Sequence, residues 1–360
     1  MSSTVKKSVR SDERIKILDG FRAIAIIAVI LYHYFYRWDD PVQPYSCAEF
    51  FHYGFRGVPF FFMISGFVIC YSLEGTENYI TFWKKRFIRL FPSIFVASIL
   101  TFMFLIVFDK SKIFEDSTHF RNVIISITFL PPNIFNLIFG TANHFSYINY
   151  SYWSLWPEIQ FYVFASTIYF FNRIYFKRNF IIICFLLLVT FNSILFFNLN
   201  QIKLLEKAIN LFSLIQYLPF FLSGALFYML YKNKKHFIYI LFLLFAFILM
   251  NLSLITSELI ASLIMFALFF FFIYYPAILA IFESRFLVSI GVSSYFLYLI
   301  HENIGVVWIR NIIAYFYPHA FIAPVLIIII MVLFSIYYTL KIESRIIKYL
   351  NSKLLKRKND

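Results

Sequence analysis

Long runs of apolar residues, separated by short polar stretches, dominate the chain from residue 18 onward. A transmembrane helix needs about 20 mostly apolar residues to cross the hydrocarbon core of a bilayer. Ten segments meet this condition, so the pattern predicts an all-α fold, a polytopic membrane helical bundle of about ten transmembrane helices. The predicted spans are residues 18–36, 57–73, 90–108, 154–172, 179–198, 209–230, 237–254, 259–282, 286–304 and 320–340.

The segment 122–140 is apolar enough for a further span, but Pro131 and Pro132 lie in its middle. Each proline lacks a backbone N–H, and lipid offers no replacement for the lost hydrogen bond. We therefore predict a re-entrant or interfacial piece within a long extracytoplasmic stretch. The predicted organisation is a cytosolic N-terminal segment (1–17), a transmembrane domain (18–341) that includes the long stretch 109–153, and a basic cytosolic tail (342–360).

Composition and charge agree with a membrane protein. The chain is 61% hydrophobic and only 14% charged, whereas soluble proteins carry roughly a quarter of charged residues. With the N-terminus in the cytosol, 23 of the 32 Lys and Arg residues fall on the cytosolic side, as the positive-inside rule requires. Both termini are therefore expected in the cytosol. The net charge of +14 indicates contact with anionic lipid rather than nucleic acid.

The first predicted span contains two ionisable residues, Arg22 and His33. Such residues are costly inside a membrane and are candidates for function. They lie eleven positions apart, which gives about 20° of net rotation and roughly 16 Å of rise, so both face one side of the helix. The alternative, that Arg22 reaches the headgroups and His33 belongs to the aromatic belt, has equal weight on spacing alone.

The second span and the cytosolic stretch that follows it add further polar candidates. Ser65 and Gly66 lie within an aromatic run and suit a close approach of two helices. Arg86 and Arg89 are three positions apart, so they share a helix face on the cytosolic side. Two guanidiniums on one face can bind phosphate bidentately, although such a pair is also a common topogenic signal.

Two later spans bring carboxylates and a second histidine to the extracytoplasmic side. Glu158 follows Pro157 about one turn inside its span, at the depth expected for His33. A carboxylate there can orient an imidazole for general-base catalysis, or it can simply be stabilised by the helix dipole. His301 and Glu302 end the ninth span. Zinc-protease, serine-hydrolase, P-loop and CxxC patterns do not occur, so no metal site is predicted.

Five motifs in order along the chain, over about residues 14–345, resemble the membrane-bound acyltransferase-3 family. They are Leu18-Asp-Gly-Phe-Arg22 with His33, Phe61-Phe-Met-Ile-Ser-Gly-Phe67, Arg86-Phe-Ile-Arg89, Trp153-Ser-Leu with Glu158 and Tyr162, and Ser294-Tyr-Phe-Leu-Tyr-Leu-Ile-His301. Three positions depart from the family's pattern. Pro157 and Ile159 are unusual beside Glu158, and Ser344 stands where proline is common.

The resemblance implies a multi-pass O-acetyltransferase of the bacterial cytoplasmic membrane. Such an enzyme moves an acyl group, most often acetyl, from cytosolic acyl-CoA to a hydroxyl of an extracytoplasmic polysaccharide or glycolipid, here expected to be O-antigen, lipopolysaccharide or exopolysaccharide. It uses no bound cofactor, and acetyl-CoA is the donor substrate. The alternative class is a transporter or flippase that uses Arg22, His33 and Glu158 as a substrate or proton path.

The expected site residues fall into four groups, and the resemblance supplies the roles of five of them: Arg22, His33, Arg86, Arg89 and Glu158. The expected catalytic residues are His33 and Glu158, and the expected donor-binding residues are Arg86 and Arg89. Positioning of the acyl group or of the transition state is expected from Arg22, Ser65, Gly66, Trp153 and Ser154. Residues expected on the acceptor side are Tyr162, Tyr295 and His301.

Overall fold

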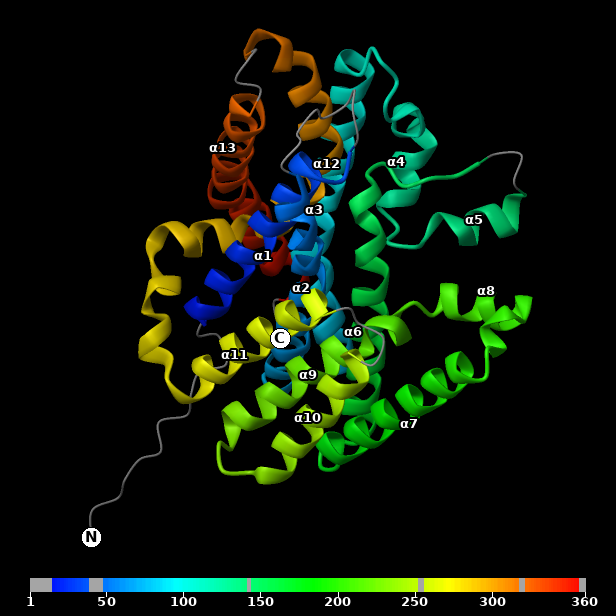
Figure 1. Ribbon diagram of the computed structural model, residues 1–360, viewed down its shortest axis with the longest axis vertical. Coiled ribbons are helices and arrows are strands. Elements are labelled where there is room, and N and C mark those ends of the chain that lie inside the picture. The colour runs from blue at the N-terminus through cyan, green and yellow to red at the C-terminus, as the bar shows by residue number, and fades with distance from the viewer. Residues whose placement is uncertain (1–14, 39–47, 141–143, 252–255, 317–320, 356–360) are drawn as a thin grey trace.

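The computed structural model describes residues 15–38, 48–140, 144–251, 256–316 and 321–355. These residues form helices joined by loops, without a strand in the described ranges (Figure 1). The all-α fold class is therefore confirmed. Most of the predicted N-terminal segment (1–14) and the end of the predicted tail (356–360) lie outside the described residues.

Each of the ten predicted spans overlaps a helix. By length and composition, six helices in the described part of the chain can cross a bilayer. A seventh span is possible if α11 (Thr256–Tyr274) and η6 (Pro276–Glu283), which meet at a bend of 106°, count as one. The count of ten spans and the side of each terminus remain predictions. The ten helices are α1 (Lys16–Phe35), α2 (Gly57–Glu74), α3 (Tyr79–Phe108), α6 (Leu155–Phe171), α7 (Phe176–Phe196), α9 (Leu214–Lys232), α10 (Phe237–Asn251), α11 (Thr256–Tyr274), α12 (Arg285–Ile312) and α13 (Ile322–Tyr337).

The segment 122–140 contains two short helices rather than a continuous one. They are α4 (Phe120–Ser126) and α5 (Pro132–Phe139), which lie beside the bundle in Figure 1. Between them Phe129 has a left-handed backbone, with φ of 64°, and Pro132 begins α5, a position where proline is tolerated. The break lies where the sequence predicts it, at the proline pair.

Shorter elements connect the long helices and extend the last one. They are η1 (Ala48–Arg56), η2 (Glu115–Thr118), η4 (Tyr150–Ser154), η5 (Leu199–Gln201), α8 (Lys203–Leu211), η7 (Ile313–Phe316), the π-helical η8 (Tyr338–Glu343) and α14 (Ser344–Leu354).

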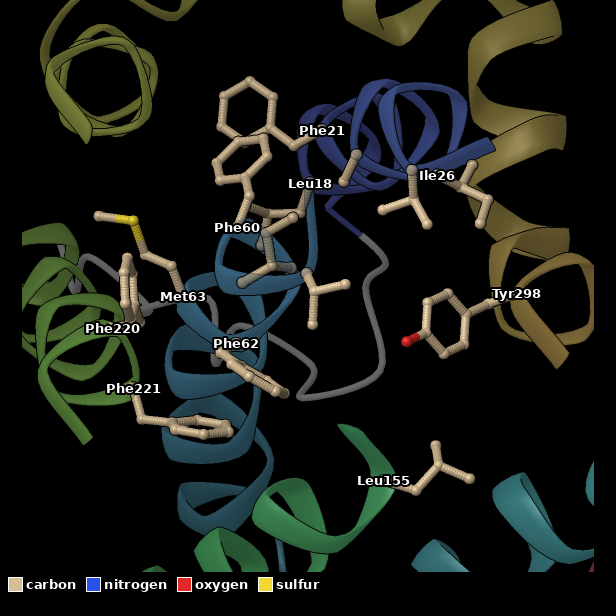
Figure 2. Close-up of a cluster of buried hydrophobic side chains, with 14 of the residues drawn as sticks. Leu18, Phe21, Ile26, Phe60, Phe62, Met63, Leu155, Phe220, Phe221 and Tyr298 are labelled. Atoms are coloured by element: carbon tan, nitrogen blue, oxygen red, sulfur yellow. The ribbon is translucent and has the colours of Figure 1, made fainter. Parts of the chain in front are cut away.

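Close helix packing forms the centre of the bundle, where α1 lies against α12 and α2 lies against α9. A Cβ added to Gly291 of α12 would lie 1.8 Å from the Asp19 carbonyl oxygen of α1. Only glycine permits this approach, which brings the polar residues of both helices together. Aromatic rings fill the remaining space, as with Phe62 and Phe221, whose ring centroids lie 4.8 Å apart (Figure 2).

Candidate active site

A cavity of about 990 Å³, which we call the His33 chamber, lies at the C-terminal end of α1. Its lining includes His33, Arg37, Tyr147, Trp153 and Glu302. Helix α1 supplies His33, Arg37 follows the end of that helix, and α12 supplies Glu302. Burial raises the pKa of the Tyr147 phenol, which lies in the long stretch outside the predicted spans. Tyr147 therefore stays protonated and can donate a hydrogen bond into the chamber.

Two histidines contact one another beside this chamber. The Nδ1 atom of buried His301 lies 2.8 Å from the Tyr298 carbonyl oxygen, so it must carry hydrogen. A neutral His301 then accepts at Nε2, which lies 3.1 Å from His33 Nδ1. That same Nδ1 atom lies 2.9 Å from the Val29 carbonyl oxygen. Because both neighbours accept, we assign a hydrogen to His33 Nδ1, which leaves His33 Nε2 as the basic nitrogen.

The carboxylate beside this nitrogen belongs to Glu302, not to Glu158. His33 Nε2 lies 3.3 Å from Glu302 Oε1, and both side chains are largely buried. The pairing of His33 with Glu158, expected from their common depth, is thus wrong. The physical reason is packing, because α12 rather than α6 runs along α1. Glu302 Oε2 is buried and has no hydrogen-bond partner among the described residues, so it can accept a hydrogen bond from a ligand hydroxyl.

Glu158 lies in a second, smaller cavity of about 80 Å³, which we call the Glu158 chamber. Its Oε1 atom accepts a hydrogen bond of 2.8 Å from Ser65 Oγ and another from the Tyr162 hydroxyl. The lining also includes Arg22, which forms an ion pair of 3.2 Å with Asp19. Glu158 is therefore held by α2 and by its own helix, away from both histidines.

A third cavity of about 450 Å³, the basic vestibule, contains Lys85, Arg86 and Arg89 in its lining. The guanidinium of Arg86 donates to Ser72 Oγ at 2.9 Å and lies over the rings of Phe82 and Tyr162. Arg86 and Arg89 also line the Glu158 chamber, as does Val68. The arginine pair therefore stands at the junction of the two cavities.

Tyr298 and Val58 line both the His33 chamber and the Glu158 chamber, so they form the wall between them. Tyr298 points from α12 toward α2 in Figure 2. Its hydroxyl donates to the Ser151 carbonyl oxygen at 2.8 Å and lies 2.8 Å from Ser154 Oγ. The three cavities thus form a series that runs from the vestibule, past the arginine pair and this wall, to His33.

The other predicted residues are divided among these cavities. Trp153 lines the His33 chamber and Ser154 lines the Glu158 chamber. Tyr162 and Tyr295 also line the Glu158 chamber, and the Tyr162 hydroxyl donates to Glu158 within its own helix. Their expected place on the acceptor side stays a prediction.

Two predicted residues lie behind the cavities rather than in their linings. His301 supports the ring of His33 from a fully buried position and does not line the three cavities. Gly66 packs against α9, where an added Cβ would lie 2.1 Å from the Phe221 carbonyl oxygen. Its role in the fold is close helix contact, which is the packing alternative that small residues suggest.

Sequence reasoning assigned no role to Tyr298 or Glu302, although it placed Glu302 beside His301 at the end of the ninth span. Their spacing contains a usable signal, because Tyr295, Tyr298 and Glu302 lie at positions i, i+3 and i+7 of one helix. Such positions share a face, which is the face that lines both chambers. The signal does not show which neighbouring helix that face meets. Groups of three residues that could hold a metal ion do not occur in the described ranges.

Comparisons with known proteins place this arrangement in context. The family model described as an acyltransferase domain, acyltransferase 3, matches residues 15–340. O-acetyltransferase OatA of Staphylococcus aureus is 34% identical over 105 residues, which are 27% of this chain and 15% of that protein. Peptidoglycan O-acetyltransferase OatA of Listeria monocytogenes is 29% identical over 171 residues, 44% of this chain and 25% of that protein.

A third relative, YrhL of Bacillus subtilis, is 29% identical over 157 residues, 41% of this chain and 22% of that protein. The chain therefore spans a quarter or less of the length of these curated relatives. No solved structure matches it.

Proposed function

Since the chain belongs to the acyltransferase-3 family, we propose that it is a membrane O-acyltransferase that moves an acyl group, most often acetyl, to a glycan hydroxyl. The proposed donor is acyl-CoA in the cytosol, and the proposed acceptor is an extracytoplasmic polysaccharide or glycolipid. The enzyme would be a multi-pass protein of the bacterial cytoplasmic membrane, with ten spans and both termini in the cytosol. The name of the Listeria relative adds peptidoglycan to the O-antigen and exopolysaccharide acceptors.

The observation that carries this proposal is the series of three cavities. The basic vestibule shares Val68, Arg86 and Arg89 with the Glu158 chamber. That chamber in turn shares Val58 and Tyr298 with the His33 chamber. The phosphates of an acyl carrier can bind the cations of the basic vestibule. Its long acyl-bearing arm can then extend through the Glu158 chamber toward the base His33.

The chemistry proposed at His33 follows from its hydrogen bonds. A glycan hydroxyl in the His33 chamber gives its proton to His33 Nε2 while its oxygen attacks the thioester carbonyl carbon. The new C–O bond forms, the C–S bond breaks, and the proton passes from the imidazolium to the leaving thiolate. Glu302, 3.3 Å from Nε2, stabilises the imidazolium that forms in between. His301 keeps the ring in the tautomer that exposes Nε2.

Arg22 and Glu158 act earlier along this path in the proposal. Both line the Glu158 chamber, through which the arm of the donor would pass. Hydrogen bonds from Ser65 and Tyr162 keep the Glu158 carboxylate in place. The guanidinium of Arg22 supplies a positive charge and N–H donors for a polar group of the arm.

Replacement of His33 tests the proposal directly. Purified protein in proteoliposomes receives acetyl-CoA with a labelled acetyl group on one side and glycan acceptor on the other. We expect His33→Ala to abolish labelled product, because the base is lost, while exposed His144→Ala retains it. Normal transfer by His33→Ala would overturn the proposed role. Accumulation of glycan in vesicles without any acyl donor would instead favour a transporter.

A further inference from the structure

The C-terminal helix α14 forms one side of the basic vestibule. It packs against α3, and Lys84 Nζ donates to the Leu354 carbonyl oxygen at 3.2 Å. Ile347, Asn351 and Leu355 line the vestibule opposite the residues of α2 and α3. Ile347 and Asn351 are four residues apart in α14, so they lie on one face of the helix, and Leu355 directly follows its last residue. The vestibule is therefore closed on this side by a segment far from the arginine motif in sequence.

A buried joint fixes where α14 leaves the bundle. The π-helical turn η8 separates α13 from α14, and its last residue, Glu343, accepts a hydrogen bond from Ser93 Oγ of α3. Both side chains are buried, at 7% and 0% exposure. A buried hydrogen bond between two side chains helps to hold its partners in one geometry. The position of α14 over the vestibule is thus set by the fold.

The basic vestibule has the positive charge and the hydrogen-bond donors to bind an anion. Its described lining includes Lys85, Arg86 and Arg89 and contains no acidic residue. Arg86 is only 9% exposed, yet its Nε–H has no hydrogen-bond partner among the described residues. A buried N–H without an acceptor is unfavourable. Arg86 lines both the vestibule and the Glu158 chamber, so an oxyanion bound beside it would supply an acceptor for this donor and a counter-charge for Lys85 and Arg89.

We propose that α14 is part of the donor site, and that Asn351 and the vestibule cations together bind the phosphate-bearing nucleotide portion of the acyl carrier. This inference rests on the proposed function and adds a wall that the five motifs do not include. The occupant is the donor because the vestibule opens past Arg86 and Arg89 into the Glu158 chamber. A lipid headgroup would need no such continuation.

A charge placed on one face of α14 tests the inference. Full-length protein is reconstituted in nanodiscs of neutral phosphatidylcholine, and coenzyme A binding is measured by calorimetry. Asn351→Glu adds a negative charge to the vestibule, so we expect the Kd for coenzyme A to rise roughly tenfold. Ser352→Glu makes the same charge change at an exposed position that does not line the vestibule, and its Kd should stay within about twofold.

A variant with a positive charge at the same position distinguishes a charge effect from misfolding. Asn351→Lys adds a fourth vestibule cation and should tighten binding severalfold, an effect that a damaged fold would not produce. Equal Kd values for Asn351→Glu and Ser352→Glu would overturn the inference. A second outcome would also overturn the inference. If coenzyme A does not bind in phosphatidylcholine nanodiscs, and phosphatidylglycerol is found bound in the vestibule, the occupant is a lipid.

The same experiment separates this inference from the proposed function. If the wild-type protein binds coenzyme A through Asn351 but transfers no acetyl group, the role of α14 in binding is supported and the proposed acyl transfer is refuted. If acetyl transfer proceeds while both glutamate variants bind coenzyme A equally well, acyl transfer is supported and the role of α14 is refuted.

Discussion

Glu302→Gln isolates the contribution of the carboxylate that lies beside the proposed base. The substitution keeps the size of the side chain and removes its charge. In the proposed transition state His33 Nε2 acquires a proton 3.3 Å from Glu302 Oε1. The variant therefore loses an attraction that grows during the reaction, which is the kind of interaction that accelerates a chemical step.

The size of the loss can be estimated from this distance. With an effective dielectric constant of about 20, full unit charges separated by the observed 3.3 Å attract by roughly 5 kcal/mol. If about half of the charge has developed in the transition state, about 2.5 kcal/mol is lost, which slows transfer roughly 50- to 100-fold. Glu302→Asp keeps the charge at a longer distance, so its rate should lie between those of the wild type and Glu302→Gln.

Initial rates of labelled acetyl transfer, measured at saturating acetyl-CoA in proteoliposomes with equal amounts of folded protein, provide the assay. Glu115→Gln is the matched control, because it removes the same charge from an exposed residue paired with Lys112. A Glu302→Gln rate within threefold of the wild type would refute the proposed stabilisation of His33 by Glu302.

Two further substitutions test the wall between the chambers and the helix crossing behind it. Tyr298→Phe removes the hydroxyl that donates to the Ser151 carbonyl oxygen, so we expect about 1 kcal/mol lower stability in thermal unfolding. Acetyl transfer should be slower, while the Kd for coenzyme A should not change. A higher Kd would show that Tyr298 acts at the vestibule instead. Gly66→Ala places a Cβ 2.1 Å from the Phe221 carbonyl oxygen and should cost about 1–3 kcal/mol by overpacking. Unchanged unfolding in detergent would contradict the close contact of α2 with α9.

Much of the helical framework is predictable because a bilayer leaves the chain few options. Apolar runs of span length become helices, since no water is present to satisfy an open backbone. The predicted span 57–73 and the observed α2 (Gly57–Glu74) differ by one residue at the C-terminal end. The predicted span 154–172 is two residues longer than α6, which has 17 residues. The end of the predicted span 237–254 lies outside the described residues.

The site was only partly predictable. Arg22 and His33 stand out because ionisable residues are rare in apolar runs, and their spacing places them on one helix face. The prediction that His33 pairs with Glu158 rested on their common depth in the predicted membrane spans. Depth does not determine which helix lies beside α1. That neighbour is α12, because Gly291 permits contact with the Asp19 backbone. The same contact brings Glu302 to His33.

The sequence by itself determined a helical membrane bundle, its family motifs and the residues that share a face within each helix. These properties depend on local periodicity and on the solvent that the chain must satisfy. Only the tertiary structure decided that Glu302 accompanies His33, that Tyr298 separates two chambers, and that α14 closes the basic vestibule. Each of these depends on side chains far apart in sequence, which meet only when helix faces pack against one another.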